Sequence, residues 1–104
     1  MKIKFFAKEF ELIKSNVDSS FGTQAAAYIS WINFTIKFDT NSNIPPIALF
    51  IHELKHYYYR VFGGVLPVSE EEECTQAGFF VYQIIMENGI DIFERFQKWW
   101  DKNE

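Results

Sequence analysis

The chain has 104 residues, of which 48% are hydrophobic and 19% aromatic, with 12 Phe, 5 Tyr and 3 Trp. This composition excludes a disordered chain and predicts one domain, over residues 1–104, with a core built largely from rings. A formal net charge of −4 excludes the basic stripe that nucleic-acid binding requires.

No apolar run in the sequence approaches the ~20 residues that span a bilayer, and the opening residues lack a signal-peptide core. Cys74 is the single cysteine, so the fold depends on no internal disulfide. We therefore expect a cytoplasmic protein that binds neither nucleic acid nor membrane.

The first predicted element is a helix over residues 3–17. Ile3, Phe6, Phe10, Ile13 and Val17 recur at spacings of three and four, with Lys and Glu between them. Such spacing is typical of an amphipathic helix. A cluster of turn-forming residues then predicts a loop over residues 16–23.

Residues 27–39 indicate a change to β structure, because they are rich in β-branched and aromatic types. Phe34, Ile36 and Phe38 alternate with polar residues, which is the period of a strand. This segment is either one long strand or two strands broken near Asn33.

A second helix is predicted to begin between residues 43 and 46 and to run to about residue 62. Pro46 suits a first helical turn, and Gly63-Gly64 would end the helix. Its predicted buried face consists of Phe50, Leu54, Tyr57 and Val61.

Two further helices complete the prediction, over residues 69–87 and 91–102. Ser69 is a natural N-cap, four glutamates follow it, and Asn88-Gly89 resembles a helix C-terminus. Trp99 and Trp100 are adjacent, so one helical face cannot bury both; self-association into a homo-oligomer and docking within the domain stay equally open. The expected class is α+β, a short sheet packed on three or four helices.

The second helix carries the sequence Ile51-His52-Glu53-Leu54-Lys55-His56. Histidines four residues apart share one face of a helix and can bind one metal ion, while the glutamate lies beside them. This is the HExxH pattern of zinc hydrolases, and it contains both histidines of the chain. His52 and His56 are thus predicted zinc ligands, and Glu53 the predicted general base.

A catalytic zinc ion needs a third protein ligand. In the helix predicted over residues 69–87, apolar residues near the C-terminal end mark one face. Continued toward the N-terminus, this face includes Glu70, Glu73 and Cys74, whereas Glu72 points outward. Glu71 lies on the flank beside the small residues. Periodicity alone leaves Glu70, Glu71 and Glu73 open as ligands, and Cys74 is expected to be a small buried residue.

The order of strand, Asn/Pro turn, HExxH helix and glutamate helix resembles the gluzincin metallopeptidases, and within them the ImmA/IrrE-like peptidases and minigluzincins. In these families the third ligand is a glutamate on a separate helix, followed by small residues in the register of Glu71, Cys74, Thr75, Ala77 and Gly78. The resemblance covers residues 34–85 and implies Glu71 as the third ligand. It also implies that the strand at residues 34–38 is an exposed edge for an extended peptide, although a plain core strand is equally consistent with its sequence.

The chain departs from the family pattern at Lys55, usually uncharged, and at Thr75, usually Asn or Asp. The predicted function is a zinc-dependent endopeptidase acting on protein or peptide substrates, latent or narrowly selective. The alternative is a non-catalytic zinc-binding or protein-interaction domain whose metal site is closed by a fourth ligand.

Overall fold

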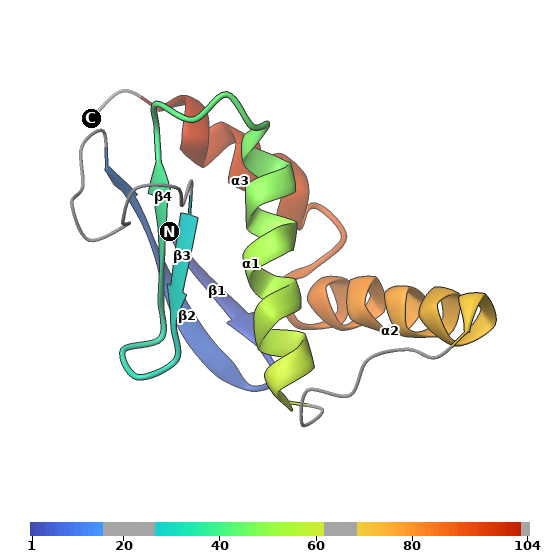
Figure 1. The fold of residues 1–104 in the computed structure, drawn as a ribbon. Helices are drawn as coiled ribbons and strands as arrows, with labels where there is room; N and C mark the ends of the chain where they lie inside the picture. The colour runs from blue at the N-terminus through green and yellow to red at the C-terminus, as the bar shows by residue number, and fades with distance from the viewer. Residues whose placement is uncertain (16–26, 62–68, 103–104) are drawn as a thin grey trace.

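A four-stranded sheet forms one layer of the molecule (Figure 1). The computed structural model describes residues 1–15, 27–61 and 69–102. The strands are β1 (Lys2–Phe5), β2 (Lys8–Ser15), β3 (Ala27–Ser30) and β4 (Thr35–Asp39), in the order β1-β2-β4-β3. The central strands β2 and β4 pair in parallel, and each edge strand pairs antiparallel with its neighbour.

Three helices lie on one side of this sheet: α1 (Pro46–Val61), α2 (Glu70–Asn88) and α3 (Ile92–Asp101). The strands alternate buried and exposed residues, so one face of the sheet is apolar and packs on the helices. Its buried residues are Ile3, Phe5, Phe10, Leu12, Ile29, Ile36 and Phe38. The predicted α+β class is confirmed. Within the described residues, no helix combines the length and apolarity that crossing a membrane requires.

The predicted first helix is wrong, because residues 2–15 form the hairpin β1–β2. Ile3, Phe5, Phe10 and Leu12 are buried in strict alternation with exposed Lys and Glu. The spacings of three and four that indicate a helix included Ile13, which is exposed here, and Val17, which lies outside the described residues. Apolar residues at every second position, the pattern of a strand, were also present in this segment, but they overlapped with the helical spacing of three and four.

The turn of this hairpin consists of Phe6 and Ala7, which both have left-handed backbone conformations, with φ of 51° and 63°. A two-residue hairpin requires such angles, and Asn-Gly usually supplies them. Here a distant residue stabilises the turn instead, since the Phe6 and Ala7 N–H groups each donate to the Glu87 carboxylate at 2.6 Å. Asn88, next to it on α2, exchanges two hydrogen bonds with the Lys4 backbone.

The predicted boundaries of the other elements are mostly confirmed. The β segment is two strands joined by a turn over residues 31–34, and α1 begins at Pro46. Ser69 caps α2 by accepting a hydrogen bond from the Glu72 N–H at 3.1 Å, and Gly89 closes the helix with φ of 96°. Val61, expected to be buried, is 43% exposed. The predicted loop at residues 16–23 and Gly63-Gly64 lie outside the described residues.

Aromatic rings join α1, α3 and the sheet. Phe50 of α1 stacks face to face on Phe96 of α3 at 4.4 Å between centroids, and Phe38 of β4 meets Phe96 edge-on. Trp99 and Trp100 both pack half-buried against Phe38, so this part of the core accommodates both indoles. Neither indole is fully buried, as expected for adjacent residues of one helix, and both dock within the domain.

We predict that Ala7→Gly raises the free energy of unfolding by about 1 kcal/mol. Ala7 is exposed and its side chain opposes a left-handed φ, a conflict that glycine does not have. Urea unfolding followed by circular dichroism measures the change.

The matched control is Ala48→Gly, an exposed alanine inside α1. There glycine should lower the free energy of unfolding by about 0.5–1 kcal/mol, because the helical backbone gains nothing from glycine's freedom. Two substitutions of the same chemistry with the same sign would contradict the turn geometry.

Candidate metal centre

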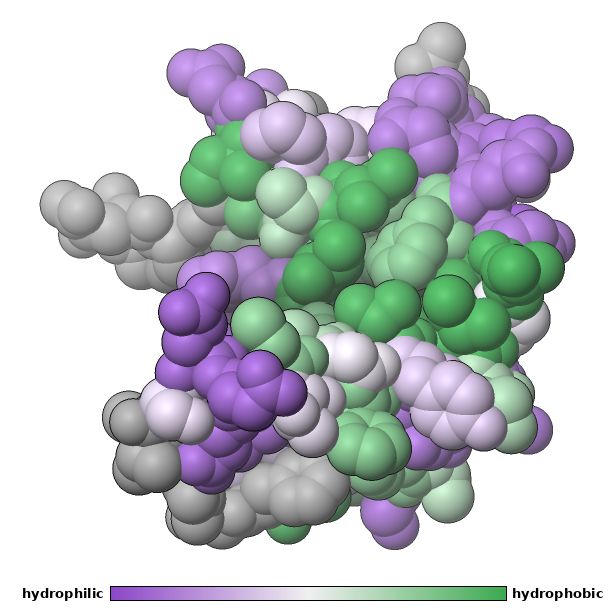
Figure 2. Space-filling model, turned by 90° about the vertical axis from the view of Figure 1, so that its right-hand side faces the viewer, coloured by the Kyte–Doolittle hydropathy of each residue, from purple (hydrophilic) through white to green (hydrophobic). Residues whose placement is uncertain are grey.

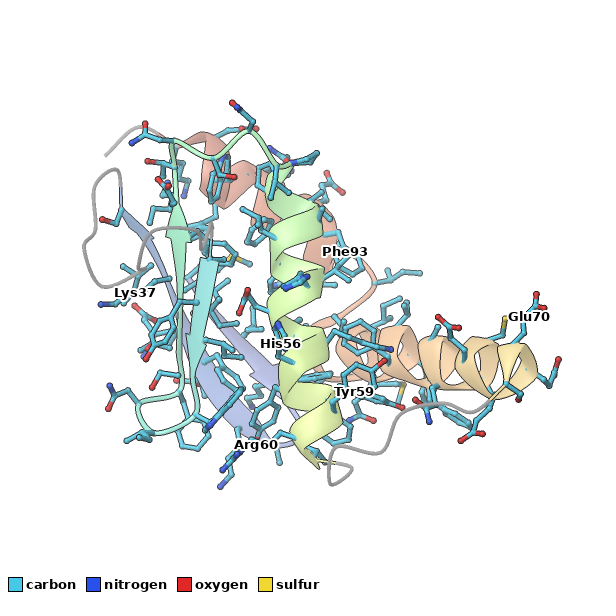
Figure 3. All side chains as sticks on the ribbon, viewed as in Figure 1. Lys37, His56, Tyr59, Arg60, Glu70 and Phe93 are labelled. Atoms are coloured by element: carbon cyan, nitrogen blue, oxygen red, sulfur yellow. The ribbon has the colours of Figure 1, made fainter. Side chains whose placement is uncertain are left out.

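Helix α1 has a core face and a polar face, and the histidines occupy the polar one. Leu49, Phe50, Leu54, Tyr57 and Tyr58 point into the core, which fixes the rotation of the helix about its axis. His52 and His56, one turn apart, are consequently exposed on the other side. Figure 3 shows His56 midway along α1.

The two imidazoles converge. Their Nε2 atoms are 3.1 Å apart, and their ring centroids 4.7 Å. A tetrahedral zinc ion with Zn–N distances of about 2.0–2.1 Å holds two ligand nitrogens about 3.3 Å apart, so the observed separation fits two ligands of one ion. Across residues 1–15, 27–61 and 69–102, His52, Glu53 and His56 are the one group whose ligand atoms could hold a metal, all within 4.8 Å.

Glu53 lies between the two faces of α1 and is only 5% exposed. Burial raises the pKa of its carboxyl above the ordinary value, and the neighbouring His56 and His52 oppose that rise. A buried carboxylate next to a metal-binding pair can accept a proton more readily than an exposed one. The predicted base thus has an environment suited to proton transfer.

A hollow of about 610 Å³ opens beside the histidines, between α1 and strand β3. Its walls include Ala27, Tyr28 and Ile29 of β3, with Trp31 and Ile44. Consecutive residues of a strand point to opposite faces, so a hollow lined by three in a row follows the strand's edge. β3 is an edge strand, paired only with β4 in the described sheet.

The edge strand implied by the family resemblance was β4, and that expectation is wrong. β4 is hydrogen-bonded on both sides, to β2 and to β3. Among the described strands, the edge beside the histidines belongs to β3 instead. The sequence signal at residues 34–38 marked a buried central strand, which shares the same alternation of residues.

Trp31 is held in the wall of the hollow by contacts from α1. The guanidinium carbon of Arg60 lies 4.8 Å from the centre of its ring, and Tyr57 packs beside it at 6.5 Å. Cation–π contacts of this kind contribute ~0.5–1 kcal/mol at exposed sites. Sequence reasoning missed Trp31, Tyr28 and Ile44, because isolated apolar residues in a turn or strand carry no signal of a shared cavity.

The glutamates of α2 are not brought to the histidines. Glu70, Glu71 and Glu73 are exposed in the first turn of α2, and none belongs to the group around His52 and His56. Figure 3 shows Glu70 at the far end of α2, away from His56. Of the residues of α2, Phe80 and Ile84 are buried, so the helix packs through its C-terminal half. Glu71 as third ligand stays a prediction.

Cys74 is exposed, so the expectation of a small buried cysteine is wrong. Lys55, the charged residue inside the motif, turns away from the histidines and lies 4.8–5.1 Å from the centres of three rings: Tyr58, Tyr59 and Phe80. Burial lowers its pKa, and Glu73 opposes that shift. The charge at this position is thus accommodated on the aromatic side of α1.

Comparisons with protein-family models, with curated proteins and with solved structures give no match to this chain. The case for a metal centre therefore rests on the geometry of His52, Glu53 and His56. That geometry establishes an HExxH-like group on a helix that could hold a metal ion.

We predict that the chain binds about one Zn²⁺ and that His52→Ala or His56→Ala abolishes binding, because one imidazole cannot hold the ion alone. Free zinc at a hundred times its Kd should stabilise the folded chain by ~2.7 kcal/mol. Elemental analysis and urea unfolding with zinc or a chelator measure both effects.

Ile51→Ala is the matched control, since Ile51 is also exposed beside His52 and offers no ligand atom. Zinc titration of further variants tests the third ligand. If Glu71 coordinates zinc, Glu71→Ala raises the zinc Kd at least about tenfold while Glu72→Ala does not. A zinc-free wild-type chain under zinc-replete conditions would exclude the centre.

The pH dependence of stability tests the burial of Glu53 in the metal-free chain. A carboxyl whose pKa is raised by folding binds its proton more tightly in the folded state than in the unfolded state. Stability therefore falls as pH rises from 4.5, the ordinary value, through the raised pKa. We predict that Glu53→Gln, which cannot ionise, becomes progressively more stable than wild type across that window and loses this advantage below it.

Urea unfolding at a series of pH values in the presence of a chelator measures the difference. Glu11→Gln is the control, because Glu11 is an exposed carboxylate on the outer face of β2. A difference between Glu53→Gln and wild type that is independent of pH would show that Glu53 is solvated.

Proposed function

We propose that this chain is a zinc-dependent endopeptidase. The observation that carries the proposal is the convergence of His52 and His56 beside a buried Glu53, at the wall of an apolar hollow that follows an edge strand of the described sheet. Each part has a role in peptide hydrolysis. The histidines bind metal, the glutamate moves a proton, and the strand edge binds the peptide.

His52 and His56 would hold the ion, with Glu71 proposed as the third ligand from the family resemblance. Imidazole nitrogens with a carboxylate oxygen form a donor set that suits zinc. When bound, zinc polarises a peptide carbonyl and makes water more acidic. A glutamate of α2 reaches the histidines only if the N-terminal half of that helix takes another position, and this half is the part of α2 without buried residues.

Glu53 would act as the general base. Its carboxylate takes a proton from the attacking water and passes it to the amine that leaves. A pKa raised by burial favours this role, since a base works best when its pKa lies near the operating pH. The buried position also keeps bulk water from competing for the carboxylate.

β3 would bind the substrate as an added strand. An extended peptide pairs its backbone with a free edge and places alternate side chains on either side. Ile29 and Trp31 line the hollow next to that edge, so an apolar substrate side chain is favoured there. The proposed substrates are therefore extended peptides with an apolar residue near the cleaved bond.

The decisive experiment is hydrolysis of a quenched fluorescent peptide library by the zinc-loaded chain. We predict that Glu53→Gln keeps the zinc and lowers kcat at least about 100-fold, because an amide of the same size cannot accept the water's proton. Glu11→Gln should retain full activity.

Peptides N-methylated at alternate backbone positions test the strand edge, since each methyl group removes one donor. Loss of cleavage at one set of positions and not the other supports pairing with β3. A wild-type chain that binds zinc but hydrolyses no peptide would favour the alternative, a non-catalytic metal domain.

A further inference from the structure

The hollow beside the histidines ends at a positively charged side chain. Trp31, in the wall of the hollow, directly follows β3, and the guanidinium carbon of Arg60 lies 4.8 Å from the centre of its ring. Arg60 comes one helical turn after His56, so the two residues share a face of α1. Figure 3 shows Arg60 beyond His56, toward the C-terminal end of that helix.

A second cation lies beside the same turn of the chain. The turn begins with Trp31 and ends with Phe34, and the ammonium of Lys8 lies 5.6 Å from the centre of the Phe34 ring. Each end of the turn thus has a positive charge over an aromatic ring. We refer to Lys8, Arg60 and these two rings as the cationic corner.

Neither cation is neutralised by a carboxylate of the described residues. Across residues 1–15, 27–61 and 69–102, the ion pairs lie in the β1–β2 hairpin and on α3, and none includes Lys8 or Arg60. In the same ranges the Arg60 guanidinium donates no hydrogen bond. A guanidinium over a ring keeps N–H donors for a ligand, and their planar arrangement matches a carboxylate.

The acidic residues of the chain gather on other elements. Residues 70–73 are four glutamates in the first turn of α2, while Asp91, Glu94 and Asp101 lie at the N-cap or within α3. Figure 2 shows the side toward which α2 projects, where hydrophilic residues lie in groups around a hydrophobic middle. The chain has a net charge of −4, so the cationic corner is a local exception that attracts a negative group.

We propose that the cationic corner is a substrate subsite for a carboxylate, with Arg60 as the residue that determines this specificity. The inference rests on the proposed peptidase function and narrows its substrates to peptides with an acidic group near the cleaved bond. Arginine binds a carboxylate through two parallel charge-assisted hydrogen bonds. Trp31 holds the guanidinium in position, which lowers the entropy lost when the carboxylate binds.

The lengths of helix and strand give the position of that acidic group. His56 and Arg60 are four residues apart in α1, which is about 6 Å along the helix axis. An extended peptide covers about 3.3 Å per residue, so the same span corresponds to about two residues. The carboxylate is therefore expected about two or three residues from the cleaved bond.

The direction of the peptide decides which carboxylate reaches Arg60. β3 and α1 run in the same direction in Figure 1, and the cationic corner follows the C-terminal end of β3. A peptide antiparallel to β3 brings an Asp or Glu side chain from the N-terminal side of the cleaved bond. A parallel peptide brings the C-terminal side, where the terminal carboxylate of a short substrate can also bind.

Peptide binding tests the subsite separately from hydrolysis. The probes are fluorescent alanine peptides of about ten residues with a central leucine and one Glu at successive positions, and each has a partner with Gln instead. Fluorescence anisotropy measures their binding to the Glu53→Gln chain in zinc and in chelator. At one position Glu should lower the Kd at least about tenfold relative to Gln in both conditions, because the cationic corner contains no metal ligand.

Variants of the arginines test the residue assignment. Arg60→Gln should abolish the preference for Glu, and Arg60→Lys should retain part of it, because an ammonium keeps the charge without the planar fork. Arg95→Gln is the matched control, since it removes the same group from α3, where Arg95 pairs with Asp91. Peptides ending in an acid or an amide distinguish a side-chain carboxylate from a terminal one, and circular dichroism confirms that each variant folds.

Hydrolysis of the same peptides by the zinc-loaded wild-type chain separates the two proposals. A preference for Glu in binding without cleavage would support the subsite and count against the peptidase. Cleavage of Glu and Gln peptides at equal rates would overturn the subsite and leave the peptidase standing. A chain that binds neither peptide, or a preference for Glu that survives Arg60→Gln, would also overturn the subsite.

Discussion

The stacked rings of Phe50 and Phe96 determine how α1 lies on the sheet. Phe50 is fully buried between α3 and the core, and Phe38 of β4 closes the contact from the sheet. Because a helix turns by 100° per residue, fixing Phe50 also fixes the direction of His52 and of Glu53. The candidate metal centre is therefore positioned by apolar packing on the far side of the same helix. Loss of the Phe96 ring would cost ~3–5 kcal/mol and remove that constraint.

Local signals in the sequence were sufficient where an element is specified by its own residues. Pro46 marks the start of α1, Ser69 and Gly89 mark the two ends of α2, and the spacing of His52 and His56 predicts their convergence. In each case the chemistry acts within one or two helical turns. Such features follow from geometry that any helix shares.

Local signals failed where the deciding contact comes from elsewhere in the chain. The hairpin at residues 2–15 has no Asn or Gly at its turn, and Glu87 supplies the hydrogen bonds that hold Phe6 and Ala7. The expected burial of Cys74 failed for a related reason. The periodicity assumed that α2 packs along its whole length, whereas its buried residues, Phe80 and Ile84, lie in its C-terminal half. A hydrophobic pattern indicates which side of a helix is apolar but not how much of it is covered.

The Glu87 carboxylate also sets an order of events during synthesis. β1 and β2 precede the rest of the described sheet in the chain, yet the residue that satisfies their turn follows 80 positions later. At ~5–20 residues per second, about 4–16 s pass before Glu87 is made. Until then the hydrogen bonds from the Phe6 and Ala7 N–H groups to the Glu87 carboxylate cannot form. The turn between β1 and β2 thus gains its two hydrogen bonds only after α2 has been synthesised.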